Sequence, residues 1–489
     1  MPASPKFNFA GRLLNRLGER SCLIDAATGE TVSPKDLPRA ISNFASKLLG
    51  LGMEENERIL INCNLSPSTG IAYLGAMYAG LVPVPIEKDT INSSLSELLE
   101  RTGARAVWTE ENSEVERLTQ PGVLSLHGLP PTTCSSPIPP VARREGDLAV
   151  LVATSGTTGT PRFVMVSHGN LTANTEAIVR SQNLLGDERA MLILPLSYCF
   201  GASAFHTHLY QGGGVVFDSR FMFPDKVLHA INKYRCTTFA GVPTVYNILL
   251  RRSHLGSIPM PSLRRFLQAG GPLAPQQVAE MRDTVPMAKF YVMYGQTEAT
   301  ARITCLDPAH LDAKLGSVGR PLDNLTVRIV DEEGRDLSTG QTGEIMVSGP
   351  SITLGYLNEP EESGCVFQDG WLRTGDLGHL DGDGYLWIDG RKAHFLKIRG
   401  VRVSIAEVET RVASLPGVSE CAAAAVPHAE VGEALALYIV PDHDATELVD
   451  KVRRSLPTCW NCESINIVSQ IPKTARGKVA RAALLKKAA

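Results

Sequence analysis

The stretch that decides the fold is Leu148-Ala149-Val150-Leu151-Val152-Ala153-Thr154-Ser155-Gly156-Thr157-Thr158-Gly159-Thr160-Pro161. Its apolar first part, residues 148–153, predicts a short buried strand. Hydroxyl residues and glycines follow, and the N–H and O–H groups of such a loop can surround phosphate oxygens. The common P-loop is absent, because no Lys-Ser/Thr pair follows Gly159. The stretch therefore predicts a phosphate-binding loop of another kind, with a polar surface turn as the alternative.

Upstream of this loop, helix and strand signals alternate. A helix is predicted with Ser33-Pro34 as its N-cap and first position, and one apolar face made of Leu37, Ile41, Phe44, Ala45 and Leu48. Residues 58–61 and 82–86 predict buried strands, with a helix near residues 71–77 between them. Such alternation predicts an α/β layered domain with largely parallel strands.

Downstream, the pattern changes twice. Residues 344–347 and 385–388 predict strands in a turn-dense stretch rich in Gly and Asp. Past residue 391 a capping box at Ser404–Glu407 begins a helix, and strands at 421–426 and 435–440 and a helix near 447–455 follow. We therefore predict one domain over residues 1–390 and a compact α+β domain over residues 391–489.

Length, charge and cysteine usage exclude several classes of protein. The chain has 489 residues and a formal net charge of −3, which gives no electrostatic case for nucleic acid or an acidic membrane surface. No apolar run approaches the ~20 residues that span a bilayer. Ten scattered cysteines are too sparse for a disulfide scaffold, so a reduced, cytoplasmic enzyme is expected. His206 and His208 could ligate a metal from one face of a strand, although core packing is the more frequent role of such a pair.

Three further segments carry chemistry. Tyr294-Gly295-Gln296-Thr297-Glu298 offers a hydroxyl and a carboxylate, which suit a phosphate oxygen and magnesium, and a capped turn is the alternative. Thr374-Gly375-Asp376 with Gly390-Arg391 supplies a carboxylate for sugar hydroxyls and a nearby cation, or simply two β-turns. Pro472–Lys478 is a basic glycine-containing loop, or a solvated basic tail.

In order and spacing these segments resemble the signature motifs of the adenylate-forming superfamily, which includes acyl-CoA synthetases, adenylation domains of peptide synthetases and luciferases. The resemblance covers nearly the whole chain, with supporting matches at 168–171, 241–244, 269–272, 316–321 and 355–358. It implies an α/β fold: a large N-terminal domain of two sheet–helix subdomains plus a small β subdomain, and a smaller mobile C-terminal α+β domain. It also implies an ATP-dependent reaction in which a carboxylate forms an acyl-adenylate and a thiol then takes the acyl group.

The same resemblance implies roles for individual residues. Lys478 would bridge the carboxylate and the α-phosphate, while Glu298 holds magnesium and Thr297 contacts phosphate. Asp376 would bind the ribose hydroxyls, with Arg391 beside them, and the small C-terminal domain would turn about a hinge at Ala393 so that Gly400 lines the approach of the thiol. The other ATP- or AMP-binding residues implied are Thr154, Ser155, Gly156, Thr157, Thr158, Gly159, Gly270, Gly271, Tyr294, Gly295, Gln296 and Ile388.

The chain departs from the family pattern at two places. After Pro161 it reads Arg162-Phe163, where the family has Lys-Gly, and we expect Phe163 to stiffen the loop. Ala393 stands where most members have Asp or Lys. Both are expected to tune the rate of the conformational step.

The acid pocket is predicted from the segment after Pro195-Leu196. It contains no acidic residue, so an ammonium buried there would be costly and an acid without an α-amino group is favoured. The expected wall is made of Tyr198, Phe200, Gly241, Tyr246, Gln268 and Thr300. Coenzyme A is the expected thiol. An acyl-carrier protein acting in trans and a nucleotide-binding protein without turnover are the alternatives, and whether the chain forms a homodimer stays open.

Overall fold

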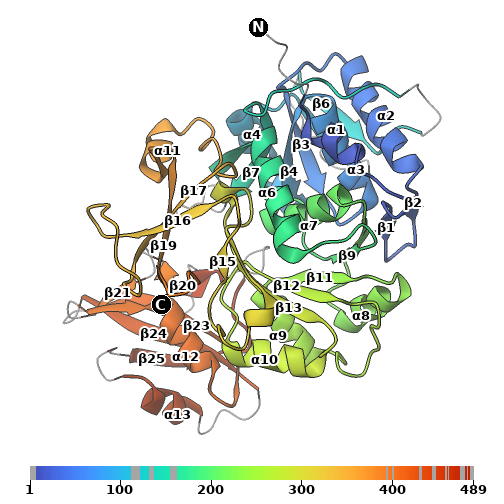
Figure 1. The fold of residues 1–489 in the computed structure, drawn as a ribbon. Coiled ribbons are helices and arrows are strands. Elements are labelled where there is room, and N and C mark those ends of the chain that lie inside the picture. The colour runs from blue at the N-terminus through green and yellow to red at the C-terminus, as the bar shows by residue number, and fades with distance from the viewer. Residues whose placement is uncertain are drawn as a thin grey trace.

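The computed structural model describes most of the chain. The described residues are 7–111, 122–131, 137–154, 162–391, 395–398, 401–428, 432–442, 448–457, 460, 462–473, 479–481 and 483–484. Figure 1 shows the blue-to-green part of the chain on the right, yellow strands and an orange helix of the preceding part on the left, and the C-terminal unit at the lower left. In the described part of the chain, no helix has both the length and the apolar character that crossing a membrane requires.

The first sheet is parallel and confirms the predicted alternation. Its order is β4-β3-β5-β6; in the sequence helix α2 precedes β3, and helices α3 and α4 lie between its strands. The bounds are α2 (Asp36–Gly50), β3 (Arg58–Cys63), α3 (Pro67–Tyr78), β4 (Val82–Glu87), α4 (Lys88–Thr102), β5 (Ala106–Thr109) and β6 (Leu124–His127).

Helix α2 buries the face that its periodicity predicts, since Leu37, Ile41, Phe44, Ala45 and Leu48 are all inaccessible to solvent. It begins two residues later than expected. The Ser33 hydroxyl still accepts from the Asp36 amide at 3.2 Å, but Pro34 lies in the turn before the helix.

The second sheet has nine strands in the order β15-β14-β13-β12-β11-β9-β10-β1-β2. Its centre is parallel, and antiparallel strands lie at both edges. The strands are β1 (Leu23–Asp25), β2 (Thr31–Val32), β9 (Arg189–Leu192), β10 (Gly214–Phe217), β11 (Thr238–Gly241), β12 (Arg265–Gln268), β13 (Lys289–Tyr294), β14 (Thr304–Leu306) and β15 (Arg320–Pro321). The helices of this region are α1 (Phe9–Leu14), α6 (His168–Gln182), α7 (Cys199–Tyr210), α8 (Pro224–Lys233), α9 (Pro243–Arg252) and α10 (Pro275–Thr284).

His206 and His208 lie on helix α7, so their predicted placement on a strand was wrong. Both are buried, and burial lowers the pKa of His206 to about 3 and that of His208 to about 4. Among the described residues no group of three metal-ligating side chains occurs. These two histidines therefore behave as core residues.

The predicted strand before the glycine-rich loop is β7 (Leu148–Thr154), and it pairs antiparallel with β8 (Arg162–Ser167). Phe163 belongs to β8 and is 2 % exposed, in a core cluster with Leu151 and Ala153. The loop at 155–161 lies outside the described residues, so the expected stiffening by Phe163 stays a prediction. Its side chain packs in the core of the sheet.

A small antiparallel sheet follows, with the path β16-β17-β19-β18 and with β20 paired to β19. Asp376 lies inside β19 and Arg391 ends β20, so the two-turn alternative for these segments is wrong. The bounds are β16 (Thr326–Val330), β17 (Gly343–Ser348), α11 (Pro360–Val366), β18 (Phe367–Gln368), β19 (Trp371–Leu380) and β20 (Leu386–Arg391).

The C-terminal unit has its own sheet and its own core. The sheet follows β22-β21-β24-β23, with β25 paired to β24, and a core cluster includes Val408 and Leu437. The division at residue 390 stays a prediction. The bounds are β21 (Phe395–Ile398), β22 (Val401–Ser404), α12 (Ile405–Ala413), β23 (Val418–His428), β24 (Gly432–Pro441), α13 (Leu448–Ser455) and β25 (Cys462–Ile467).

Candidate active site

A cleft of about 2010 Å³ brings the predicted nucleotide-binding segments together. Its walls come from the end of β13, from β19 and β20, and from α12 and β23 of the C-terminal unit. Every nucleotide-site residue predicted within the described part of the chain lines it, namely Thr154, Gly270, Gly271, Tyr294, Gly295, Gln296, Thr297, Glu298, Asp376, Ile388 and Arg391.

The segment after β13 forms a tight turn into a 3-10 helix at Thr297–Ala299. Gly295 is required there, because a Cβ at this position would lie 1.9 Å from the Ala301 carbonyl oxygen. The Gln296 Nε2 atom is buried in this turn without a hydrogen-bond partner among the described residues. A buried amide of this kind, in a residue that lines a cleft, is suited to a polar ligand.

Glu298 is held by a tyrosine from a distant segment. The Tyr356 hydroxyl donates to Glu298 Oε1 at 2.9 Å, and burial, followed by the Glu298 charge, raises the pKa of Tyr356. Thr353 donates to the Glu298 carbonyl through its amide and its hydroxyl, both at 3.0 Å. Backbone and side chain of Glu298 are thus both oriented by residues 353–356.

Asp376 is a nearly buried carboxylate with a partner on each oxygen. The Tyr294 hydroxyl donates to Oδ2 at 2.6 Å, and Arg391 Nε donates to Oδ1 at 2.8 Å. The Asp376 charge raises the pKa of Arg391, and burial together with that charge raises the pKa of Tyr294. The three side chains form one fixed polar group on the cleft wall.

Gly270 and Gly271 follow β12, close to helix α7. A Cβ on Gly270 would lie 2.3 Å from the Tyr198 hydroxyl, and Gly270 has a φ of +89°. Gln268 Nε2 donates to the Gly271 carbonyl at 2.7 Å and holds the turn closed. Glycine is therefore needed at 270 for both the turn and the close approach of Tyr198.

The predicted wall of the acid pocket is only partly in the cleft. Tyr198 and Gln268 line it, whereas Phe200, Gly241, Tyr246 and Thr300 are not among the described residues that do. Tyr246 is fully buried in an aromatic cluster, and its hydroxyl donates to the Leu267 carbonyl at 2.7 Å.

The other three lie behind the cleft surface for steric and bonding reasons. A Cβ on Gly241 would lie 2.8 Å from the Val245 side chain, so glycine there lets α9 pack closely. The Thr300 hydroxyl donates to the Ser351 carbonyl at 2.7 Å. Phe200 packs edge-on against Tyr198.

Several predicted residues lie outside the described residues, namely Ser155, Gly156, Thr157, Thr158, Gly159, Ala393, Gly400 and Lys478. Lys473 and Arg481, which lie on either side of Lys478 in the sequence, both line the cleft. Lys473 donates to Glu420 at 2.9 Å, and Arg481 donates to Glu409 at 2.7 Å.

The structure adds two cleft residues to which the sequence assigned no role in the site. Arg162 forms ion pairs with Glu359 at 3.1 Å and Glu362 at 3.0 Å, and its guanidinium lies over the Tyr356 ring. Tyr356, which positions Glu298, lies in a motif that signalled the family but not this contact. The sequence has no pattern that predicts the Tyr356–Glu298 hydrogen bond or the ion pairs of Arg162, because the partners are far apart in the chain.

Known proteins are similar to this chain in sequence. The model of the AMP-binding enzyme family matches residues 12–357, and the model of the AMP-binding enzyme C-terminal domain matches residues 407–478. A feruloyl-CoA synthase of an Amycolatopsis species is 31 % identical over 463 residues, which cover 92 % of this chain and 93 % of the relative. A 4-coumarate–CoA ligase-like protein of Oryza sativa subsp. japonica is 29 % identical, over 99 % of this chain and 94 % of the relative.

Solved structures are similar over the whole length. ATP-bound MatB from Rhodopseudomonas palustris superposes with a TM-score of 0.89 at 26 % identity and covers 99 % of each chain. The o-succinylbenzoate CoA synthetase of Bacillus subtilis, bound to its acyl-adenylate intermediate, superposes with a TM-score of 0.85 at 27 % identity over 98 % of each chain.

Proposed function

The chain belongs to the AMP-binding enzyme family, and on this premise we propose that it is an ATP-dependent ligase joining a carboxylic acid to coenzyme A. One observation carries the proposal: Glu298 and the group of Tyr294, Asp376 and Arg391 all face one cleft, which the C-terminal unit also lines. Relatives named as CoA ligases support coenzyme A as the acceptor.

The reaction has two steps. A carboxylate oxygen attacks the α-phosphorus of ATP, and pyrophosphate leaves with the electrons of the broken P–O bond. The thiol sulfur then attacks the acyl carbonyl carbon, AMP leaves, and the thiol proton passes to solvent. No enzyme nucleophile is needed, so catalysis rests on positioning and on electrostatic stabilisation.

Asp376 is suited to hold the nucleoside. Its carboxylate is oriented by Tyr294 and Arg391, yet it retains lone pairs for the paired hydroxyls of a ribose. Because both partners are fixed before the ligand arrives, little reorganisation accompanies binding.

The side-chain oxygens of Glu298 and Thr297 fit a magnesium ion. Glu298 contributes a carboxylate and Thr297 a hydroxyl, both hard oxygen donors that line the cleft. When bound, the ion would neutralise charge on the phosphates. The chain's own residues orient the carboxylate, through the bond from Tyr356.

The C-terminal unit is proposed to bring Lys478 to the reacting carboxylate and α-phosphate for the first step. Lys473 and Arg481, on either side of residues 474–478, both line the cleft. Turning of this unit about Ala393, with Gly400 beside the thiol path, is proposed for the second step.

The test is a panel of acyl, aryl and amino acids, scored for pyrophosphate release and for AMP plus thioester, with and without coenzyme A. Release that depends on a non-amino acid and consumes coenzyme A is the expected result. Release without thioester formation would overturn coenzyme A as acceptor in favour of a carrier protein in trans. Binding of ATP without release for any acid would overturn the ligase proposal.

A further inference from the structure

Among the described residues three arginines are buried: Arg143, Arg265 and Arg302. The first two have acidic partners. Arg143 pairs with Glu55 at 3.0 Å, and Arg265 pairs with Glu188 at 2.5 Å. Arg302 is 2 % exposed, and no described carboxylate lies within ion-pair distance of its guanidinium. Arg302 is thus the one of these three arginines without an acidic partner among the described residues.

The surroundings of the Arg302 guanidinium are apolar. It lies over the Phe200 ring, 4.9 Å from the centroid, and Nη1 contacts the Met293 sulfur. Nε has no hydrogen-bond partner among the described residues. Burial lowers the pKa of Arg302, and the cation–π contact only partly compensates for the lost hydration.

The backbone of Arg302 is fixed. Asn174 of α6 donates to the Arg302 carbonyl through Nδ2 at 2.9 Å and accepts from the Arg302 amide at 3.3 Å. Two residues earlier, Thr300 has a φ of +67°, an unfavourable value for a β-branched residue. The fold therefore fixes the backbone at Arg302, close to a strained residue at position 300.

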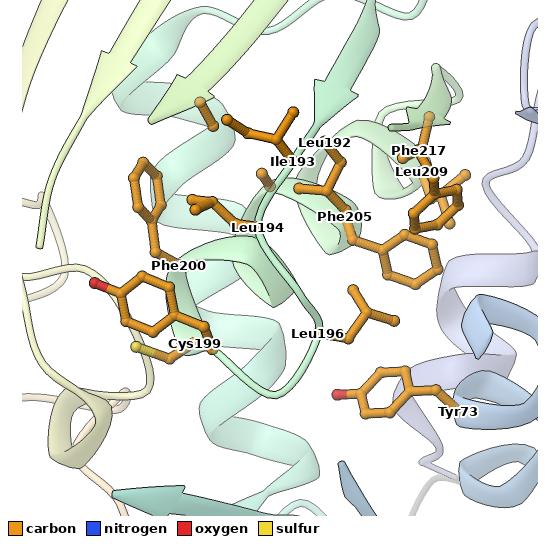
Figure 2. Close-up of a cluster of buried hydrophobic side chains, with 14 of the residues drawn as sticks. Tyr73, Leu192, Ile193, Leu194, Leu196, Cys199, Phe200, Phe205, Leu209 and Phe217 are labelled. Carbon is orange, nitrogen blue, oxygen red and sulfur yellow. The ribbon is translucent and has the colours of Figure 1, made fainter. Parts of the chain in front are cut away.

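The guanidinium lies directly behind the cleft. Tyr198, Cys199 and Met293 line the cleft, and Met293 and Phe200, the neighbour of Cys199, contact the Arg302 guanidinium. Figure 2 shows Cys199 and Phe200 on the left of the view, away from Phe205, Leu209 and Phe217 on the right. The Met293 side chain, which is flexible by nature, lines the cleft and contacts the guanidinium.

A buried cation without a counter-ion is unfavourable unless a ligand supplies one. The planar guanidinium matches a carboxylate through two parallel hydrogen bonds. We propose that Arg302 is a specificity-determining residue that binds a second carboxylate of the substrate, so that the enzyme activates a dicarboxylic acid. The proposal rests on the proposed ligase function. Displacement of the Met293 side chain would open the path to the guanidinium.

The experiment compares dicarboxylic acids with their monomethyl esters and with monocarboxylic acids of equal length. Pyrophosphate release is measured for the wild type and for R302M, R302K and the exposed-arginine control R180M, whose residue pairs with Asp323. We expect the wild type to favour the dicarboxylic acid by about 10²-fold or more in kcat/KM, because the site would otherwise leave its charge unpaired. R302M should lose that preference through a higher KM for the acid, with the KM for ATP unchanged. R302K should retain part of the preference.

Equal or better use of the monocarboxylic acids by the wild type would overturn the inference and leave the ligase function standing. A preference for dicarboxylic acids that R302M retains would overturn the assignment to Arg302. Absence of release with every acid would instead overturn the ligase proposal. Methionine fills a similar volume without a charge, so R302M is expected to fold, and the thermal unfolding midpoint checks this. If R302M does not fold, the wild-type panel still decides the substrate class.

Discussion

Asp376 and Arg391 lie directly opposite each other on the antiparallel strands β19 and β20, and the guanidinium donates to the carboxylate at 2.8 Å. Their pairing depends on strand register, because a shift of one residue would turn one side chain to the other face of the sheet. The pair stands at the end of β20, immediately before the segment that leads to the C-terminal unit.

Replacing Asp376 with asparagine is expected to weaken ATP binding and leave the fold intact. The amide keeps the shape, but it loses the charge that pairs with Arg391 and one acceptor oxygen. We expect kcat/KM for ATP to fall by about 10²-fold, which is typical of a lost charge-assisted hydrogen bond pair. Steady-state kinetics with varied ATP test this. The matched control is D336N, at an exposed carboxylate that pairs with Arg328, and an equal loss in both variants would contradict the role of Asp376.

Replacing Tyr356 with phenylalanine is expected to raise the magnesium concentration needed for half-maximal pyrophosphate release by about 3–10-fold, because one hydrogen bond that orients Glu298 is lost. The unfolding free energy should fall by about 1 kcal/mol. Tyr210 provides the control, because its hydroxyl also donates to a glutamate, Glu176, at a place away from the cleft. Y210F should lower stability without changing the magnesium requirement. A shift of that requirement in both variants would argue against positioning by Tyr356.

Replacing Lys478 with alanine is expected to slow the first step selectively. Adenylate formation, measured by ATP–pyrophosphate exchange, should fall by about 10²–10³-fold, because a cation facing the charge of the transition state is removed. Thioester formation from supplied acyl-adenylate should change by less than about 3-fold. K451A is the control, at an exposed lysine that bonds to the Pro416 carbonyl. Comparable losses in both steps would contradict the assigned role of Lys478.

Acid should destabilise the fold through its buried histidines. Folding lowers the pKa of His168 and of His206 to about 3 and that of His208 to about 4, in each case mainly by burial. The unfolded chain therefore binds more protons below its ordinary histidine pKa of about 6.5. The unfolding free energy should fall as pH drops through the window from about 6.5 to 4, by up to about 1.4 kcal/mol per pH unit for each histidine.

Urea unfolding at pH 7.5, 6.0 and 5.0 measures this slope. H206F should make the slope of stability against pH less steep, because it removes one group that takes up a proton on unfolding. Phenylalanine suits the site, because the ring at 206 stacks on Tyr73 and contacts Phe9. The exposed His254 provides the control variant H254Q. An unchanged slope in H206F would show that His206 is not protonated on unfolding within this window.

Much of the fold was predictable because its signals are local. The apolar run at 148–153, the amphipathic residues at 37–48 and the alternation of strand and helix each act within one element. The segments proposed to bind the nucleotide could be located in the sequence for the same reason. Their chemistry resides in short segments, such as Tyr294–Glu298, and the order of these segments along the chain matches the family.

The acid pocket was not predictable in the same way. Gly241 begins a family motif and Tyr246 follows it closely, yet the packing of α9 against β11 and β12 leaves both outside the cleft lining. Whether a side chain faces the cleft depends on the angles between elements, and no local pattern encodes those angles. The placement of Thr374–Asp376 in a strand likewise depended on β17 and β20, which pair with it from elsewhere in the chain.

The sequence by itself determined the family and the order of the elements, and it predicted the residues that we propose meet the nucleotide, because these follow from short-range pattern and composition. Only the tertiary structure decided which distant groups touch: Tyr356 on Glu298, Arg391 on Asp376, and Arg302 enclosed by Phe200 and Met293 without an acidic partner among the described residues. The physical reason is that burial and pairing are properties of the packed whole. From the sequence alone an arginine is expected at the surface, and only the folded structure shows that Arg302 is buried.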